Sequence, residues 1–149
     1  MKQLVISIMN NNLFYTCSLI EYIGREKKQR RGDVVAALGS NALHRIYKYS
    51  DVLHSDPIEH VADQYAGLSR IEEGTFDNVG ACQYTVPTYC DIGKVFCRLV
   101  EDVSDEDHLK GIEKAYKSWL SDAISNYNSD LFYQPRDYLK ECYLAGEVL

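Results

Sequence analysis

Apolar residues recur every three or four positions along most of the chain, which is the spacing of one face of an α-helix. The longest such pattern covers residues 104–127 and includes the only tryptophan, Trp119. Ser104 is predicted as its N-cap, and the acidic residues that follow oppose the positive end of the helix dipole. This stretch predicts a long amphipathic helix on which other elements pack. Its apolar positions are Leu109, Ile112, Tyr116, Trp119, Leu120, Ala123, Ile124 and Tyr127.

The first 67 residues show the same period in several shorter segments, each bounded by a capping residue, a proline or a glycine. The first of these is predicted to end in a run of cations, which a helix C-terminus favours. The predicted helices are 13–29 after Asn12, 34–38 closed by Gly39, 41–54, and 57–67 after Asp56.

The middle of the chain departs from the helical period. Residues 67–87 contain no clean repeat and are predicted to form an irregular connection. Within it, residues 82–86 have the composition of a strand, and the apolar residues 1–8 are their only plausible partner. We therefore predict an extended loop at 82–86, with a short β pairing to an N-terminal arm, residues 1–11, as the alternative.

Two further helices complete the pattern. Thr88 and Asp91 have the spacing of a reciprocal cap for a helix that ends near Val103. Pro135 precedes a last helix at 136–145. The chain has 149 residues, of which 46% are hydrophobic and 26% charged, as is usual for a globular protein. We expect a single all-α domain, residues 1–149, of six or seven helices.

Cysteine usage bears on location and on metals. The chain has five cysteines, an odd number without paired spacings, and no secretory signal is evident. These features favour reduced thiols in a cytoplasm, and no apolar run is long enough to span a bilayer. Zinc sites need closely spaced pairs of ligands, which this sequence lacks. We predict neither a metal nor a cofactor.

One cysteine is a candidate nucleophile. Cys90 falls in the first turn after Thr88, where backbone N–H groups stabilise a thiolate. Such chemistry needs a histidine as its base, with His54 and His108 as candidates, and His44 and His60 as further choices. The alternative is a small buried thiol, which is the commoner role. His54 also lies at a predicted helix C-terminus, where capping of backbone carbonyls is the commoner role.

The charge is unevenly distributed. Residues 1–50 hold eight Lys or Arg against three acidic residues, whereas the remaining 99 residues hold eight against nineteen. The basic run at the end of the first helix is a candidate contact for phosphates or for an acidic partner. The net charge of −6 and the pI near 5.2 argue against nucleic acid. The run comprises Arg25, Lys27, Lys28, Arg30 and Arg31.

Tyrosine is abundant, at 12 of 149 residues, and some of these residues, such as Tyr49, fall outside the apolar stripes. Exposed tyrosines are enriched at protein interfaces. Two segments rich in aromatic residues, 13–24 and 46–54, make residues 13–66 resemble a group of small helical Firmicutes proteins of unknown function. Some of those proteins are encoded beside toxins that resemble ADP-ribosyltransferases. The resemblance implies an antitoxin-like, non-enzymatic role.

The leading hypothesis is therefore a cytoplasmic module that binds another protein, one encoded by a neighbouring gene being the first candidate. The contacts are predicted at the basic run and at Tyr47, Tyr49 and His54. The alternatives are an enzyme that uses Cys90 with a histidine and a nucleic-acid-binding protein that uses residues 25–31. No membrane association is expected.

Overall fold

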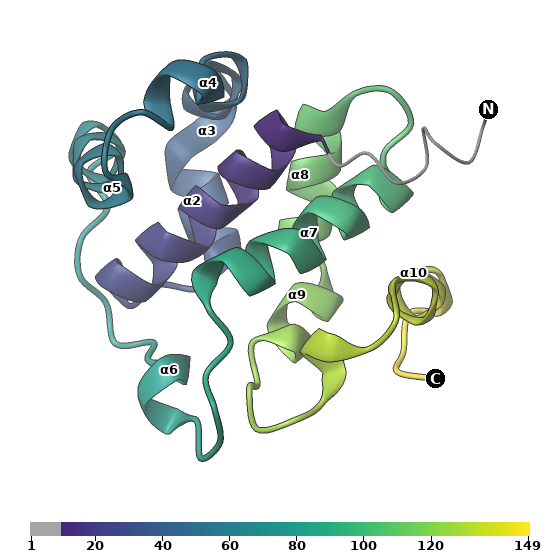
Figure 1. Ribbon diagram of the computed structural model, residues 1–149. Coiled ribbons are helices and arrows are strands. Elements are labelled where there is room, and N and C mark those ends of the chain that lie inside the picture. The colour runs from purple at the N-terminus through teal and green to yellow at the C-terminus, as the bar shows by residue number, and fades with distance from the viewer. Residues whose placement is uncertain (1–9) are drawn as a thin grey trace.

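Helix α2 (Asn11–Lys27) lies at the centre of the fold, and ten of its 17 residues are buried. The structure is a computed structural model that describes residues 10–149. Helix α7 (Tyr89–Val103) packs along α2, and α3 (Arg31–Lys48) and α5 (Ile58–Leu68) cover other faces of it (Figure 1). The central helix is thus the one with the largest share of buried residues, and not the predicted 104–127 stretch.

The ends of α2 differ from the predicted ones. The Asn10 side chain, rather than that of Asn12, caps the helix by accepting a hydrogen bond from the Leu13 N–H at 3.0 Å. The Asn12 side chain instead accepts a 2.6 Å hydrogen bond from the Ser50 hydroxyl. The helix ends at Lys27 because Lys28 adopts a left-handed conformation, with φ of 51°.

Helix α3 contains the break that the sequence predicts at Gly39. This residue has φ of 76° and ψ of 170°, a region that essentially only glycine occupies. The two halves of α3 correspond to the predicted helices 34–38 and 41–54. The second half, however, ends at Lys48, and the short helix α4 (Ser50–Leu53) follows. Helix α5 then starts at Ile58, one residue later than predicted, with Pro57 and not Asp56 at the N-cap position.

The irregular connection is confirmed for residues 69–88, with one short helix inside it, α6 (Asn78–Ala81). The Asp77 side chain caps α6 by accepting from the Gly80 N–H at 2.8 Å. Residues 82–86 form no strand among the described residues, and the expected partner segment, residues 1–8, lies outside them.

The capping box of α7 is confirmed. The Thr88 hydroxyl accepts from the Asp91 N–H, and the Asp91 carboxylate accepts from the Thr88 N–H, both at 3.0 Å. The helix is strongly amphipathic, and its buried side chains, Phe96 and Cys97 among them, face α2 and α8 (His108–Tyr116).

The long helix predicted over 104–127 is wrong. Asp107, not Ser104, caps α8, and the chain breaks at residues 117–118 before α9 (Trp119–Ile124) begins. The Ser118 hydroxyl makes the second cap by accepting from the Ser121 N–H. A serine that can cap ends the first helix even though the apolar period continues past it. Trp119 is 36% exposed and is not the packing wall that the pattern suggested.

The chain ends with a 3₁₀ turn (Leu131–Tyr133) and α10 (Arg136–Ala145), which packs on α7. Gly146 closes α10 with φ of 77°, as predicted. The all-α class is confirmed, since residues 10–149 contain no strand, and the splitting of the predicted helices brings the number of α-helices in this range to nine. Within the same range, no helix has the length and apolar character that a membrane crossing requires.

Candidate functional site

A cavity of about 590 Å³ opens between α2, α4, the start of α5 and the start of α7. Its volume is in the range of sites that hold small ligands or side chains. Of these four helices, α2 and α7 lie at the centre of Figure 1, and α4 and α5 lie at its upper left. Its lining residues are Asn11, Phe14, Tyr15, Ser18, Ser50, Asp51, His54, Asp56, Pro57, Ile58, Tyr89 and Cys90.

Two hydroxyl groups of α2 in this lining have no hydrogen-bond partner among the described residues. They belong to Tyr15 and Ser18, whose exposed fractions are 8% and 4%. A buried polar group without a partner costs about 1–3 kcal/mol, so such groups are rare outside functional sites. Both residues lie on the same side of α2 because they are three positions apart. Each hydroxyl oxygen has almost no accessible surface, so it lies behind the cavity wall, out of reach of a bound group.

The position of Ser18 depends on a close approach of α2 and α7. A Cβ atom at Gly93 would lie 2.3 Å from the Ser18 hydroxyl oxygen and 2.9 Å from its backbone nitrogen. Only glycine permits this separation, so the two helices hold Ser18 at the base of the cavity.

The fold brings His54 and Cys90 to the same cavity, although they are 36 positions apart in sequence. His54 follows α4, and its ring packs edge-on against Tyr15 at a centroid distance of 5.9 Å. Cys90 lies in the first turn of α7 and is exposed, not buried. The predicted pairing of this cysteine with a histidine therefore has one possible base, His54.

The other histidines lie away from this cavity. His108 begins α8 and stacks on Tyr47 at a centroid distance of 6.3 Å, and its Nδ1 atom is buried without a partner among residues 10–149. His60 lies 3.5 Å from the Asp56 carboxylate on the exposed start of α5. Neither they nor His44 line the cavity.

The cavity is acidic and aromatic. Asp51 and Asp56 line it, whereas no lysine or arginine in the described part of the chain does. Burial raises the pKa of Tyr15 to about 12, and the nearby Asp56 carboxylate adds to this shift. The rings of Phe14 and Tyr89 supply further aromatic surface. The lining therefore favours a bound cation over a bound anion.

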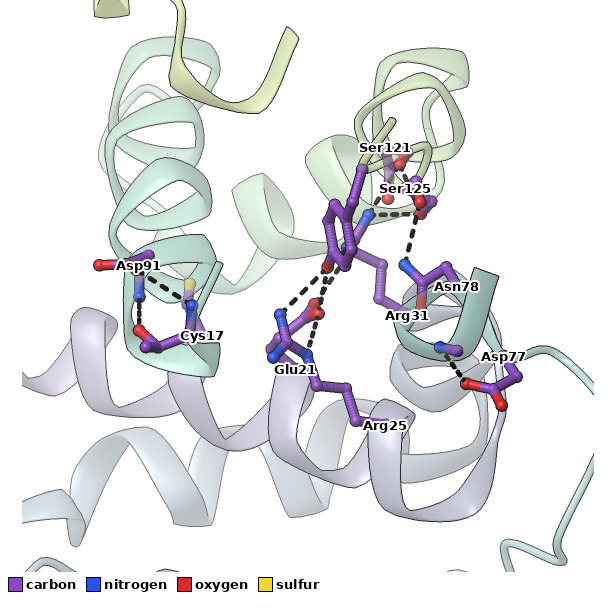
Figure 2. Close-up of polar contacts among 12 residues, drawn as sticks. Cys17, Glu21, Arg25, Arg31, Asp77, Asn78, Asp91, Ser121 and Ser125 are labelled. Carbon is purple, nitrogen blue, oxygen red and sulfur yellow. Dashed lines mark hydrogen bonds and ion pairs between the residues drawn. The ribbon is translucent and has the colours of Figure 1, made fainter. Parts of the chain in front are cut away.

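The predicted basic cluster is divided by the fold. Arg31 is 4% exposed and donates to the Glu21 carboxylate at 2.9 Å, and Arg25 donates to the same carboxylate at 3.0 Å (Figure 2). Arg31 also donates to the Ser125 hydroxyl and the Tyr127 hydroxyl at 2.6 and 2.9 Å. Arg31 is thus part of the core and is not available as a surface contact.

This network also changes the acidity of its carboxylate. Burial alone would raise the pKa of Glu21, but the attraction of Arg31 and of Arg25 and the hydrogen bond from Tyr127 outweigh it. The pKa of Glu21 therefore lies below its ordinary value, and the group stays charged in the interior.

Three cations of the run remain nearer the surface. Lys28 and Arg30 are exposed and Lys27 is half-buried. Arg30 lies over the Phe76 ring at 4.6 Å and 3.7 Å from Asp122, so internal contacts engage it as well. The remaining cationic surface is smaller than the sequence indicates.

The two predicted contact regions lie at opposite ends of α2. Tyr47 accepts a hydrogen bond from the Asn10 side chain at one end, whereas Arg25 and Lys27 occupy the other. A 17-residue helix is about 25 Å long, which separates the two regions. Of the first region, Tyr47 is half-buried and Tyr49 is 47% exposed.

The residues that sequence reasoning missed are Tyr15, Ser18, Asp51 and Asp56. The available signal was Ser18, a polar residue within a stripe of apolar ones that becomes fully buried. Within residues 10–149, no group of three or more His, Cys, Asp or Glu side chains is placed to hold a metal ion. Comparisons with protein families, curated proteins and solved structures found no match.

Proposed function

We propose that this chain is a non-enzymatic, cytoplasmic module that binds another protein, and that its site is the face around the cavity. The observation that carries the proposal is the open cavity of about 590 Å³, which is lined by the rings of Phe14, Tyr15 and Tyr89 and by Asp51 and Asp56. A partner side chain that enters the cavity contacts these rings and carboxylates.

The rim of the cavity supports this proposal. Val52 is 68% exposed and Tyr49 is 47% exposed, and both flank the lining residues Ser50 and Asp51. Exposed aromatic and aliphatic side chains around a pocket are typical of interfaces in which one buried contact provides most of the affinity. An antitoxin-like role, with a partner encoded by a neighbouring gene, is the biological setting that we propose.

The experiment is a quantitative pull-down from the native host with the tagged full chain and two matched variants. One variant combines Tyr49→Ala with Val52→Arg at the cavity rim. The control combines Tyr133→Ala with Leu144→Arg, which are 68% and 64% exposed elsewhere on the molecule. We expect one stoichiometric protein to bind the wild type and the control, and to bind the rim variant at least tenfold less. Equal capture by all three proteins contradicts the proposed site.

The basic end of α2 is a second proposed contact, reduced to Lys27, Lys28 and Arg30. Arg25 and Arg31 are left unchanged in its test because their loss would disturb the core. Alanine at the three positions is expected to slow association, since rim charges mainly steer encounter. The association rate of this variant should also depend much less on salt than that of the wild type. An unchanged association rate would assign all contacts to the cavity face.

A second candidate function is thiol-dependent catalysis by Cys90 with His54 as base, favoured because both residues line one cavity. It predicts that iodoacetamide alkylates Cys90 faster than a cysteine in an unstructured peptide, and that His54→Gln removes the difference. If Cys90 reacts no faster than the peptide in either protein, this function is excluded.

A further inference from the structure

We propose that the cavity receives a cationic side chain, an arginine or a lysine, that the partner protein presents. This inference rests on the proposed function and names the chemistry of the group that enters the site. It is argued from the charge of the lining, from its aromatic rings and from the volume of the cavity.

The charge of the lining is negative. Asp51 and Asp56 border the cavity, and no lysine or arginine among the described residues lines it. One further carboxylate, that of Glu59, lies near Tyr89: burial raises the pKa of this phenol, and the Cys90 thiol and the Glu59 carboxylate raise it further. Within residues 10–149 the Asp56 carboxylate pairs only with His60, at 3.5 Å on the exposed surface, so no buried partner neutralises its charge.

The N-termini of α5 and α7 also border the cavity, and their partial positive charges oppose the negative charge of the lining. Each carries about half a positive charge, which favours an anion. The capping box of α7 places the Asp91 carboxylate against that terminus, and Asp56 precedes the start of α5. Asp51 and Asp56 contribute two full negative charges to the lining, and Asp91 opposes the partial positive charge at the start of α7. The site therefore attracts cations.

The aromatic lining suits a cation with an aliphatic stem. Phe14, Tyr15 and Tyr89 present rings, whose negative faces attract guanidinium and ammonium groups. A cationic side chain therefore contacts the rings and the carboxylates together. The volume of about 590 Å³ leaves room for its stem.

The test uses small probes of matched shape. N-acetyl-arginine amide, N-acetyl-lysine amide, the neutral N-acetyl-citrulline amide and the anionic N-acetyl-glutamate amide are titrated into the ¹⁵N-labelled full chain. We expect the arginine probe to shift the amide signals of Tyr15, Ser18 and His54, with at least tenfold higher affinity than citrulline. The double variant Asp51→Asn/Asp56→Asn should lose this preference, whereas Asp105→Asn/Glu106→Gln, two exposed acids in the loop before α8, should keep it.

Equal affinity for arginine and citrulline, or tighter binding of glutamate, overturns the inference, and so do shifts confined to another surface. The pull-down separates this failure from failure of the proposed function. If Tyr49→Ala/Val52→Arg abolishes capture but Asp51→Asn/Asp56→Asn does not, the binding module stands and the cationic group does not. If neither variant reduces capture, the proposed function fails.

Discussion

Single hydroxyl groups distinguish the cavity of this protein from its core. The Tyr15 hydroxyl has no hydrogen-bond partner among the described residues, whereas the Tyr127 hydroxyl donates to Glu21 at 2.5 Å and accepts from Arg31. Both residues are buried tyrosines, at 8% and 3% exposure. The same chemical change at the two positions therefore separates a hydroxyl without a partner from one that contributes to stability.

Tyr15→Phe is expected to leave the free energy of unfolding unchanged or to raise it by about 1 kcal/mol, since it removes an unpaired buried polar group. Tyr127→Phe, the matched control, is expected to lower it by about 1.5–3 kcal/mol, because its hydroxyl bonds charged groups. Urea denaturation at neutral pH measures both. A loss in Tyr15→Phe as large as in Tyr127→Phe would show that the Tyr15 hydroxyl is engaged in the free protein.

The buried pair of Glu21 and Arg31 makes stability depend on acid. The pKa of Glu21 is lowered, so its contribution is complete above the ordinary value of about 4.3 and is lost as the pH falls through the lower value of the folded state. Glu21→Gln is expected to cost about 3–5 kcal/mol at pH 7, because it leaves the Arg31 charge buried without its counter-charge.

Urea unfolding from pH 7 to pH 3 measures this dependence. The double variant Glu21→Gln/Arg31→Met serves as the control, since it removes both charges and should recover much of the loss. It should also show a shallower decline in acid than the wild type. A decline as steep as that of the wild type would assign the acid sensitivity to other carboxylates.

Residue roles at the site were hard to predict because they depend on partners distant in sequence. The run from Arg25 to Arg31 has the composition of a solvated helix end. The available clue was Glu21, a carboxylate that follows the apolar residues Leu19 and Ile20 and needs a buried counter-charge. Which of these cationic side chains point into the core is decided only when α9 and Tyr127 pack against the start of α3.

At the level of elements, helix ends are set by capping residues, and glycines determine where helices bend or touch. Gly39→Ala is expected to cost about 1–3 kcal/mol, because the positive φ of this residue strains any side chain even though no atom lies within 4 Å of the new Cβ. Gly67→Ala, at an equally open position in α5, is the control and should be neutral or stabilising by up to about 1 kcal/mol. Thermal unfolding measures the stability change of each variant. Equal changes in the two variants would contradict the proposed backbone strain at Gly39.

Gly93→Ala tests a different effect, the close approach of α7 to α2. The added Cβ would lie 2.3 Å from the Ser18 hydroxyl and 2.9 Å from backbone atoms, which cannot rotate away. We expect a loss of about 1–3 kcal/mol from overpacking. Because the crossing also positions Ser18, binding of the arginine probe should weaken even under conditions where the variant is fully folded. Chemical denaturation and the probe titration measure the two effects.

Elements were predictable from sequence wherever a cap and an apolar period agreed. Thr88 with Asp91 and Gly146 after the last helix are examples, and both are confirmed. The failure at residues 117–118 has a physical cause: apolar residues continue in step across the break, so periodicity alone does not reveal it, whereas the capping hydroxyl of Ser118 does. The cavity was not predictable, because four helices line it and no motif encodes their arrangement.

For the whole molecule, the arrangement predicts unequal local stability. Amide protons of α2 and α7 should exchange most slowly, because these two helices form the most extensive helix–helix contact and α2 also packs against α3. Residues 69–88, with only the four-residue α6 between long irregular stretches, should exchange by local opening. Hydrogen exchange followed by mass spectrometry tests this, and slow exchange across 69–88 would contradict it.

The central position of α2 has a consequence for how the chain folds during synthesis. This helix is translated before the partners that bury it, since α7 and the Tyr127 hydroxyl follow 62 or more residues later. Until then a segment with apolar side chains on most of its faces and a carboxylate that lacks its full set of donors is exposed to solvent. The nascent chain is thus expected to be a client of ribosome-associated chaperones, and stalling translation between α5 and α7 should leave it open to proteases.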